Sequence, residues 1–353
     1  MTAGVLACPA ILHADGKDRA AALAKAFLAD HRVPGLSVAY LRGGNLRHQG
    51  AYGFADLAAT EALTPAHRFR IASLSKPLTA AVVFELIGDG AFALDTPVFG
   101  QSGLLGPVSE PAAGGEWLNL VTVEHLLAHR AGGWTNDGND PMFQYPALQH
   151  AELIATTLSR ARLQAEPGTS YGYSNFGYCL LGRIIEAVIG VSYGEAVQAR
   201  LLRPAGVDGF EIGGDRQTDR KPDEVEYRGL RGDAYGMPVA RMDSHGGWIA
   251  TAEGMARVFA AMDGRKAVPD TVRAATVAGM AKPGEPGGYY GHGLAVNPAH
   301  GNGWHNGSLP GTTTLAVMVE GGNVMAGLVN GDAPGIDEAL DALMWTIYGA
   351  VMG

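Results

Sequence analysis

The chain has 353 residues, of which 47% are hydrophobic and 17% charged, and its formal net charge is −9. This length exceeds the usual single-core domain and the composition is that of a folded globular chain, so we expect two lobes. The negative charge argues against nucleic acid or an anionic membrane as a partner, and two cysteines without a CxxC pair exclude a disulfide framework and a zinc ribbon.

The N-terminal segment gives no signal for export. Residues Met1 to Leu12 lack a basic region and a long apolar core, and no run in the chain approaches the length of a membrane span. Val5 to Cys8 looks like a lipoprotein cleavage box, but only four residues precede it, and we interpret it as chance. We therefore expect a cytoplasmic protein, an expectation that a leader trimmed from the sequence would change.

Periodicity and turn residues predict the elements in chain order. A helix over 19–30 is followed by a strand over 36–41. After a turn at 42–45, a second strand runs through Gln49. A helix then begins at Ser73, and further helices are expected over 121–130, 151–163, 175–188 and 193–202. After an exposed loop over 213–231, the pattern predicts a helix over 246–262, a hairpin of strands 312–320 and 323–330, and a final helix over 336–347.

The order of these elements predicts an α/β (α+β) fold. Both ends of the chain supply helices and antiparallel strands, whereas the middle is helical. We expect one α/β lobe from residues 1–70 and 235–353, with an antiparallel sheet flanked by helices, and an inserted, mostly helical lobe from residues 71–234.

A serine and a lysine stand three residues apart where the helix after residue 70 begins. Ser73 and Lys76 share one helix face at this spacing, with roughly 5–6 Å between their Cβ atoms. Pro77 is compatible only with a first helical turn. Because a serine hydroxyl needs a neighbouring base or cation to become a nucleophile, the pair is a candidate for nucleophilic catalysis. A helix cap followed by a surface lysine is the alternative.

Two further motifs could complete such a site. In Tyr173-Ser174-Asn175, the tyrosine could accept the serine proton if the lysine ammonium made its phenolate more accessible, and the amide could hold Lys76 or a substrate carbonyl. A turn with a helix cap is the alternative. In His305-Asn306-Gly307-Ser308, the glycine would let a substrate backbone approach closely, and the histidine could bind substrate or the tyrosine. Here the alternative is a glycine-rich loop.

Two other patterns are weaker. Gly168 to Gly172 matches G-x-S-x-G, but Ser170 follows no strand, which a nucleophile elbow requires. His125 and His129 have metal-ligand spacing but no evident third ligand, so a packed or capping role is expected. We therefore predict neither a metal nor another cofactor.

Taken in order, Ser73-x-x-Lys76, Tyr173-Ser174-Asn175 and His305-Asn306-Gly307 resemble the motifs of the serine β-lactamase and penicillin-binding-protein-like superfamily. The resemblance is to class C β-lactamases, D-alanyl-D-alanine carboxypeptidases of that type and family VIII carboxylesterases. It covers most of the chain, with landmarks at Val33–Val38, Phe69–Ser73, Leu126–Gly133, Glu166–Thr169 and His245–Trp248.

The resemblance implies a role for each motif. Ser73 would be the acylated nucleophile, and Lys76 and Tyr173 the general-base pair. The backbone N–H groups of Ser73 and Ser308 would form the oxyanion hole. Asn175 would orient the substrate and Lys76. The third motif would also bind substrate, through His305, Asn306 and Gly307. It also implies a site between the α/β lobe and the helical lobe.

The third motif departs from the Lys-Thr-Gly that is usual in this superfamily. A lysine offers a fixed charge to a substrate carboxylate, whereas a histidine with an ordinary pKa is mostly neutral at pH 7. This favours a serine hydrolase that cleaves small carboxylic esters through an acyl-enzyme. Three alternatives stay open: the same chemistry on β-lactams or D-amino-acid amides and peptides, acyl transfer to an alcohol or amine, and a catalytically silent homologue.

Overall fold

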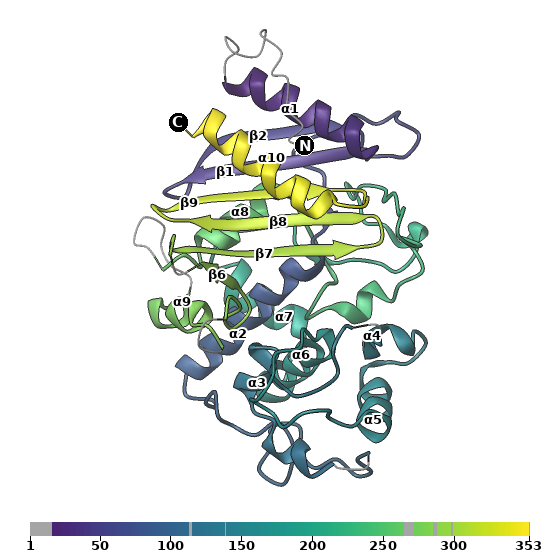
Figure 1. Cartoon of the computed structure of the whole chain (residues 1–353), viewed down its shortest axis with the longest axis vertical. Coiled ribbons are helices and arrows are strands. Elements are labelled where there is room, and N and C mark those ends of the chain that lie inside the picture. The colour runs from purple at the N-terminus through teal and green to yellow at the C-terminus, as the bar shows by residue number, and fades with distance from the viewer. Residues whose placement is uncertain are drawn as a thin grey trace, which may run out of the picture.

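The computed structural model describes residues 16–112, 115–137, 139–264, 272–284, 288–297 and 299–352. Residues 1–15, on which the expectation about export rests, lie outside this range. Six strands form one antiparallel sheet in the order β2-β1-β9-β8-β7-β6, which joins the two ends of the chain (Figure 1). They are β1 (Gly35–Arg42), β2 (Asn45–Gly53), β6 (Ala295–Asn297), β7 (Asn302–Leu309), β8 (Thr312–Val319) and β9 (Asn323–Val329).

Helices cover both faces of this sheet. The first helix, α1 (Gly16–His31), packs against the last, α10 (Ile336–Val351), on the near face in Figure 1, and α8 (Ala252–Ala260) packs against β1 and β9 from the other side. Strand β1 is buried along seven of its eight residues because its side chains alternate between two covered faces. The predicted α/β fold with an antiparallel sheet is confirmed.

Most of the remaining helices lie below the sheet in Figure 1 and come from the middle of the sequence. The central one, α2 (Ser75–Gly88), is buried almost all round and packs against α6 (Asn175–Ile189), as expected for an apolar helix without a polar face. The others are α3 (Val123–Leu127), α4 (Pro141–Gln144), α5 (His150–Arg160), α7 (Tyr193–Val197) with a π-helical turn (Gln198–Leu202), and α9 (Ala274–Ala281). Short 3-10 turns span Ala72–Leu74, Gly115–Leu120, Gln217–Asp219 and Val239–Met242.

Two of the predicted helices are much shorter in the structure. The helix predicted over 121–130 spans only Val123–Leu127, because Thr122 caps it and His129 has a φ of +57°. The helix predicted over 246–262 begins six residues later, at Ala252, where Thr251 caps it. Before it, β5 (Trp248–Ala250) pairs with β3 (Phe69–Arg70) and β4 (Glu211–Ile212) in a small second sheet.

No single helix in the described ranges is long and apolar enough to cross a membrane; α6 and the helical segment after it reach that length only together, with a 77° bend between them. The proposed lobe boundaries at residues 70/71 and 234/235 stay a prediction.

Candidate active site

Ser73 lies in the 3-10 turn that leads into α2, and strand β7 packs against this turn. The residue before it, Ala72, has a φ of +49°, a backbone conformation that costs about 1–3 kcal/mol in a residue with a Cβ. Such strain persists only where the surrounding structure enforces it. Ser73 lines an open cavity of about 500 Å³, so this turn presents its hydroxyl to a volume large enough for a small substrate.

Lys76 is fully buried, and its ammonium nitrogen has three hydrogen-bond partners. Its Nζ lies 3.0 Å from Ser73 Oγ, 2.7 Å from Asn175 Oδ1 and 3.1 Å from the carbonyl oxygen of His245. Burial lowers the pKa of Lys76 from 10.5 to about 7, although the Asp140 carboxylate acts in the opposite direction. A neutral amine is therefore available near pH 7 beside the serine hydroxyl, and it can accept the serine proton.

Tyr173 lies against the same pair of groups, but its electrostatics differ from our expectation. Its hydroxyl hydrogen-bonds Ser73, and Lys76 Nζ lies 4.6 Å from the centre of its ring. Burial raises the pKa of Tyr173 above its usual value, and Asp140 raises it further. The expectation that the lysine would make the phenolate more accessible is wrong here. The geometry favours Lys76 as the base and Tyr173 as a neutral hydroxyl that relays or orients the proton.

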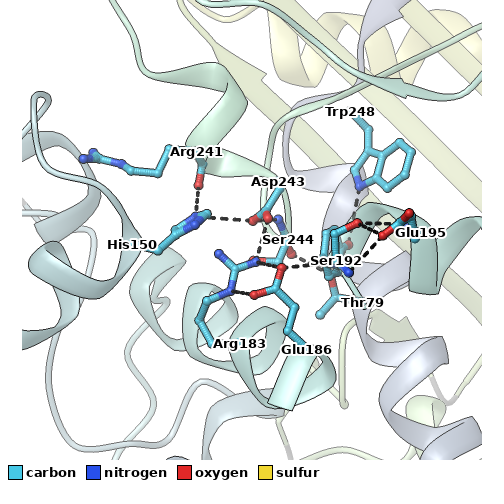
Figure 2. Close-up of polar contacts among 11 residues, drawn as sticks. Thr79, His150, Arg183, Glu186, Ser192, Glu195, Arg241, Asp243, Ser244 and Trp248 are labelled. Atoms are coloured by element: carbon cyan, nitrogen blue, oxygen red, sulfur yellow. Dashed lines mark hydrogen bonds and ion pairs between the residues drawn. The ribbon is translucent and has the colours of Figure 1, made fainter. Parts of the chain in front are cut away.

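The carbonyl that accepts from Lys76 belongs to a segment held by buried charges, which sequence reasoning missed. Figure 2 shows Asp243 between Arg183 and His150, with separations of 2.6 Å and 3.7 Å. His150 Nε2 also lies 2.8 Å from the carbonyl oxygen of Arg241. This network joins α5 and α6 to Arg241 and Asp243, which lie shortly before His245 in the chain. Its members are too far apart in the sequence to form a local motif.

Strand β7 carries the third motif, and its side chains alternate between the cavity and the interior. Asn306 and Ser308 line the cavity, whereas His305 is 3% exposed and does not. His305 Nε2 lies 3.0 Å from Tyr290 Oη, and Nδ1 lies 2.6 Å from the carbonyl oxygen of Asn306. The structure thus places His305 behind the cavity wall, next to the ring of Tyr173.

Burial also changes the acidity of this histidine. It lowers the pKa of His305 from 6.5 to about 3, and the nearby Lys76 adds to the effect. Our expectation of an ordinary imidazole that titrates near pH 6.5 is therefore wrong, and His305 is neutral throughout the working range. It can shape the position of Tyr173 without offering charge to a substrate.

Gly307 is required by a close approach between β7 and the turn that bears Ser73. A Cβ atom at this position would lie 2.6 Å from the carbonyl oxygen of Ile71 and 2.9 Å from the amide nitrogen of Ser73, and would also clash with Thr314. Strand β6 pairs with β7 only from Asn302 to Trp304. The edge of β7 after Trp304 therefore faces the turn that bears Ser73. This arrangement is compatible with the predicted oxyanion hole of the Ser73 and Ser308 amides, which stays a prediction.

The two weaker patterns do not reach the cavity. Ser170 is exposed and is absent from the cavity lining. His125 caps the start of α3 with Thr122, and the buried His129 accepts a hydrogen bond from the Ser174 amide and stacks on Tyr173 at 4.2 Å. In the described ranges, no group of three or more His, Cys, Asp or Glu side chains is placed to hold a metal ion.

Two charged residues of the cavity were absent from our sequence-based set. Asp140 lies on the wall beside Asn175, and Arg231 lies near Ser308, to whose Oγ its guanidinium donates at 2.8 Å. Asp140 followed by Pro141 is a recognisable helix start, but nothing local in the sequence connects it with Lys76. Arg231 lies in the predicted loop 213–231, whose position depends on the fold.

Known proteins resemble this chain to different extents. A model of the family described as Beta-lactamase matches residues 20–347. Esterase EstB of Burkholderia gladioli is 28% identical over 190 residues, which are 51% of this chain and 47% of EstB. A D-aminopeptidase of Brucella ovis is 29% identical over 194 residues, which are 52% of this chain and 34% of that protein. The chain thus spans less than half the length of these curated relatives.

Among solved structures, the D-amino acid amidase of Ochrobactrum anthropi SV3 in complex with L-phenylalanine has a TM-score of 0.77 and 22% identity, over 95% of this chain and 99% of the amidase. At that identity the likeness shows the fold alone. The match of the family model to nearly the whole chain places this protein in the Beta-lactamase family.

Proposed function

We propose that this protein hydrolyses small uncharged carboxylic esters through an acyl-enzyme on Ser73. The reaction would begin with attack of Ser73 Oγ on the ester carbonyl while Lys76 takes the hydroxyl proton. The leaving alcohol would receive that proton through Lys76 or the Tyr173 hydroxyl, and water activated by the same groups would then release the acid. The amides of Ser73 and Ser308 would stabilise the oxyanion of both tetrahedral intermediates.

The preference for uncharged esters is supported chiefly by position 305. The third motif carries a neutral, buried imidazole where related peptidases and β-lactamases are expected to have a lysine. Arg231 is the cation on the cavity wall, but its guanidinium already lies 3.4 Å from both Asp332 and Asp337, and these two carboxylates offset its charge. The similarity to an esterase adds to this support.

One observation favours a second candidate, the hydrolysis of D-amino-acid amides. Asp140 places a carboxylate on the cavity wall, where it could receive the ammonium group of such a substrate. The similarity to a D-aminopeptidase agrees with this candidate. However, both oxygens of Asp140 already accept hydrogen bonds within the protein, so an incoming ammonium would have to share them. We therefore rank it second.

The two candidates separate in one set of measurements. We expect kcat/KM to be highest for p-nitrophenyl esters of short acids, far lower for D-phenylalanine amide and nitrocefin, and absent for all of them in Ser73→Ala. Because the side chain at position 305 lies behind the cavity wall, His305→Gln, which stays neutral, should leave the ratio of nitrocefin to ester turnover unchanged. Turnover of nitrocefin or the amide by the wild type as efficient as that of its best ester would refute the proposal. Product analysis with added methanol would reveal acyl transfer.

A further inference from the structure

Asp140 is linked to Lys76 through a single side-chain amide, that of Asn175. It is the N-cap residue of α4, where its Oδ1 accepts from the Met142 amide at 2.9 Å. Its Oδ2 accepts from Asn175 Nδ2 at 2.7 Å, and Asn175 Oδ1 in turn accepts from Lys76 Nζ at 2.7 Å. The three side chains thus form a chain of two short hydrogen bonds from a carboxylate to the candidate base.

The chemistry of a carboxylate leaves only one direction for this chain. An ionised carboxylate can accept hydrogen bonds but cannot donate them. The Asn175 amide must therefore present its NH₂ group to Asp140, which turns its oxygen toward Lys76. The reverse orientation would place an NH₂ group against the lysine and an oxygen against the carboxylate. Of the two amide orientations, only the observed one gives Lys76 an acceptor.

We propose that Asp140 is a positioning residue of this active site, which locks the Asn175 amide so that its oxygen holds Lys76 beside Ser73. The inference rests on the proposed function only in taking Lys76 as the base for acylation. It adds a residue that contacts neither Ser73 nor the acyl group directly, and to which no motif of the sequence points.

The surroundings of Lys76 make Asp140 its main electrostatic partner as well. The groups that face the lysine are Tyr173 and Tyr178 from the start of α6, His129 after α3, His245, His305 on β7, and Asp140. Burial lowers the pKa of each of the three histidines and raises that of both tyrosines, so these five groups are neutral near pH 7. Asp140 raises the pKa of Lys76 against the effect of burial.

The loop that carries Asp140 is itself firmly held. The Arg241 guanidinium donates to the carbonyl oxygens of Met142, Tyr145 and Leu148, at and after α4. Burial raises the pKa of the Asp140 carboxyl, whereas the hydrogen bonds from Met142 and Asn175 and the charges of Lys76 and Arg241 act in the opposite direction and favour its ionised form. On the other side of the loop, Asn136 Oδ1 accepts from the Asn175 amide at 2.9 Å. The carboxylate therefore has a fixed position from which to orient its partner.

The test is the rate at which a neutral fluorophosphonate phosphonylates Ser73, with loss of fluoride, followed from pH 5 to 9 by intact-protein mass spectrometry. In Asp140→Asn, the new amide can accept from only one of the two N–H donors, and its NH₂ group favours a flipped Asn175. We expect a rate at pH 8 about 10-fold lower, because Lys76 loses the Asn175 oxygen, one of the acceptors that hold it beside Ser73. The acid limb of the profile, where the rate falls as Lys76 becomes protonated, should move to lower pH by about 1 unit. Removing the negative charge of Asp140 lowers the pKa of Lys76.

A swap variant separates positioning from general damage. In Asp140→Asn combined with Asn175→Asp, the amide at 140 accepts from Met142 and donates to the carboxylate at 175, whose other oxygen accepts from Lys76. Every donor regains an acceptor, so labelling of Ser73 should return to within about 3-fold of the wild-type rate, whereas Asn175→Asp alone places two carboxylates together and should stay slow. The acid limb of the swap variant should lie at higher pH than that of the wild type, since the negative charge is now adjacent to Lys76 and raises its pKa.

Two further variants make the result decisive. Asp56→Asn is the matched control, because Asp56 also accepts from backbone N–H groups, of Thr60 and Glu61, but lies outside the cavity lining; its profile should match the wild type. If Asp140→Asn does not fold, Asp140→Glu keeps the charge on a longer arm, and it should lower the rate but leave the acid limb in place.

Three results would overturn the inference. The first is an Asp140→Asn variant whose rate falls off at the same acid pH as that of the wild type, and the second is an Asp140→Glu variant whose rate falls off at a different pH. The third is a swap variant that is labelled as slowly as the slower of its two single variants. Because labelling of Ser73 needs no ester turnover, failure of the ester proposal remains distinguishable: the protein would be labelled normally and still hydrolyse no ester.

Discussion

The pH dependence of acylation follows from the burial of one lysine. With a pKa of about 7 for Lys76, about nine-tenths of the protein carries a neutral amine at pH 8 and about one-tenth at pH 6. A lysine of ordinary pKa 10.5 would be neutral in only about 3 of 10,000 molecules at pH 7. Burial therefore increases the concentration of the active base by about three orders of magnitude at neutral pH.

We expect kcat/KM for a neutral p-nitrophenyl ester to fall about 10-fold from pH 8 to pH 6, along a limb with one apparent pKa near 7. Release of p-nitrophenol is measured at its isosbestic wavelength, so that its own ionisation does not distort the profile. His305 should add no second limb in this range, because its pKa is about 3.

The lysine itself supplies the control. Lys76→Arg keeps a positive charge at this place but cannot lose its proton, so kcat should fall by roughly 10²–10⁴-fold at every pH tested. A wild-type acid limb at or below pH 5, or substantial activity in Lys76→Arg, would show that a neutral Lys76 is not the base.

The remaining predictions concern single residues. Tyr173→Phe should lower kcat by roughly 10²–10⁴-fold, and combining it with Lys76→Ala should be scarcely worse than the worse single variant; fully additive losses would mean separate proton paths. Gly307→Ala should abolish activity and lower the melting temperature, because its methyl group has no room, while Ser170→Ala should keep wild-type kcat/KM. Dialysis against EDTA should leave activity unchanged; a loss that zinc restores would contradict our account. Since the pKa of Lys76 is lower in the folded than in the unfolded chain, the free energy of unfolding should rise between pH 7 and 9, and Lys76→Met should flatten that rise.

Local patterns predicted the parts of this structure that depend on neighbours in sequence. Ser73 and Lys76 lie three residues apart, so a helical turn alone brings them together. The hairpin of β8 and β9 turns at Gly321 and Gly322, both with positive φ, as the paired glycines indicate. The apolar stripes of α6 and α10 likewise gave their positions to within a few residues.

Features that depend on tertiary contacts were not predictable in the same way. Trp248 to Ala250 resembled the start of a helix, but their pairing with Phe69 and Arg70 makes them a strand. The altered pKa of His305 arises from burial against residues of other elements, which a single sequence does not reveal. The bond from Asp140 to Asn175 spans 35 residues and depends on how the loop before α4 folds back.

The central claim, an ester-derived acyl-enzyme on Ser73, is tested most directly by trapping that intermediate. The protein is mixed with a p-nitrophenyl ester at pH 8, quenched with acid within milliseconds to seconds, digested and mapped by mass spectrometry. Our account predicts a burst of p-nitrophenol close to one equivalent per chain whenever deacylation is the slower step, and the mass of the acyl group on the peptide that contains Ser73. An acyl group on another residue, or ester turnover that persists in Ser73→Ala, would contradict it.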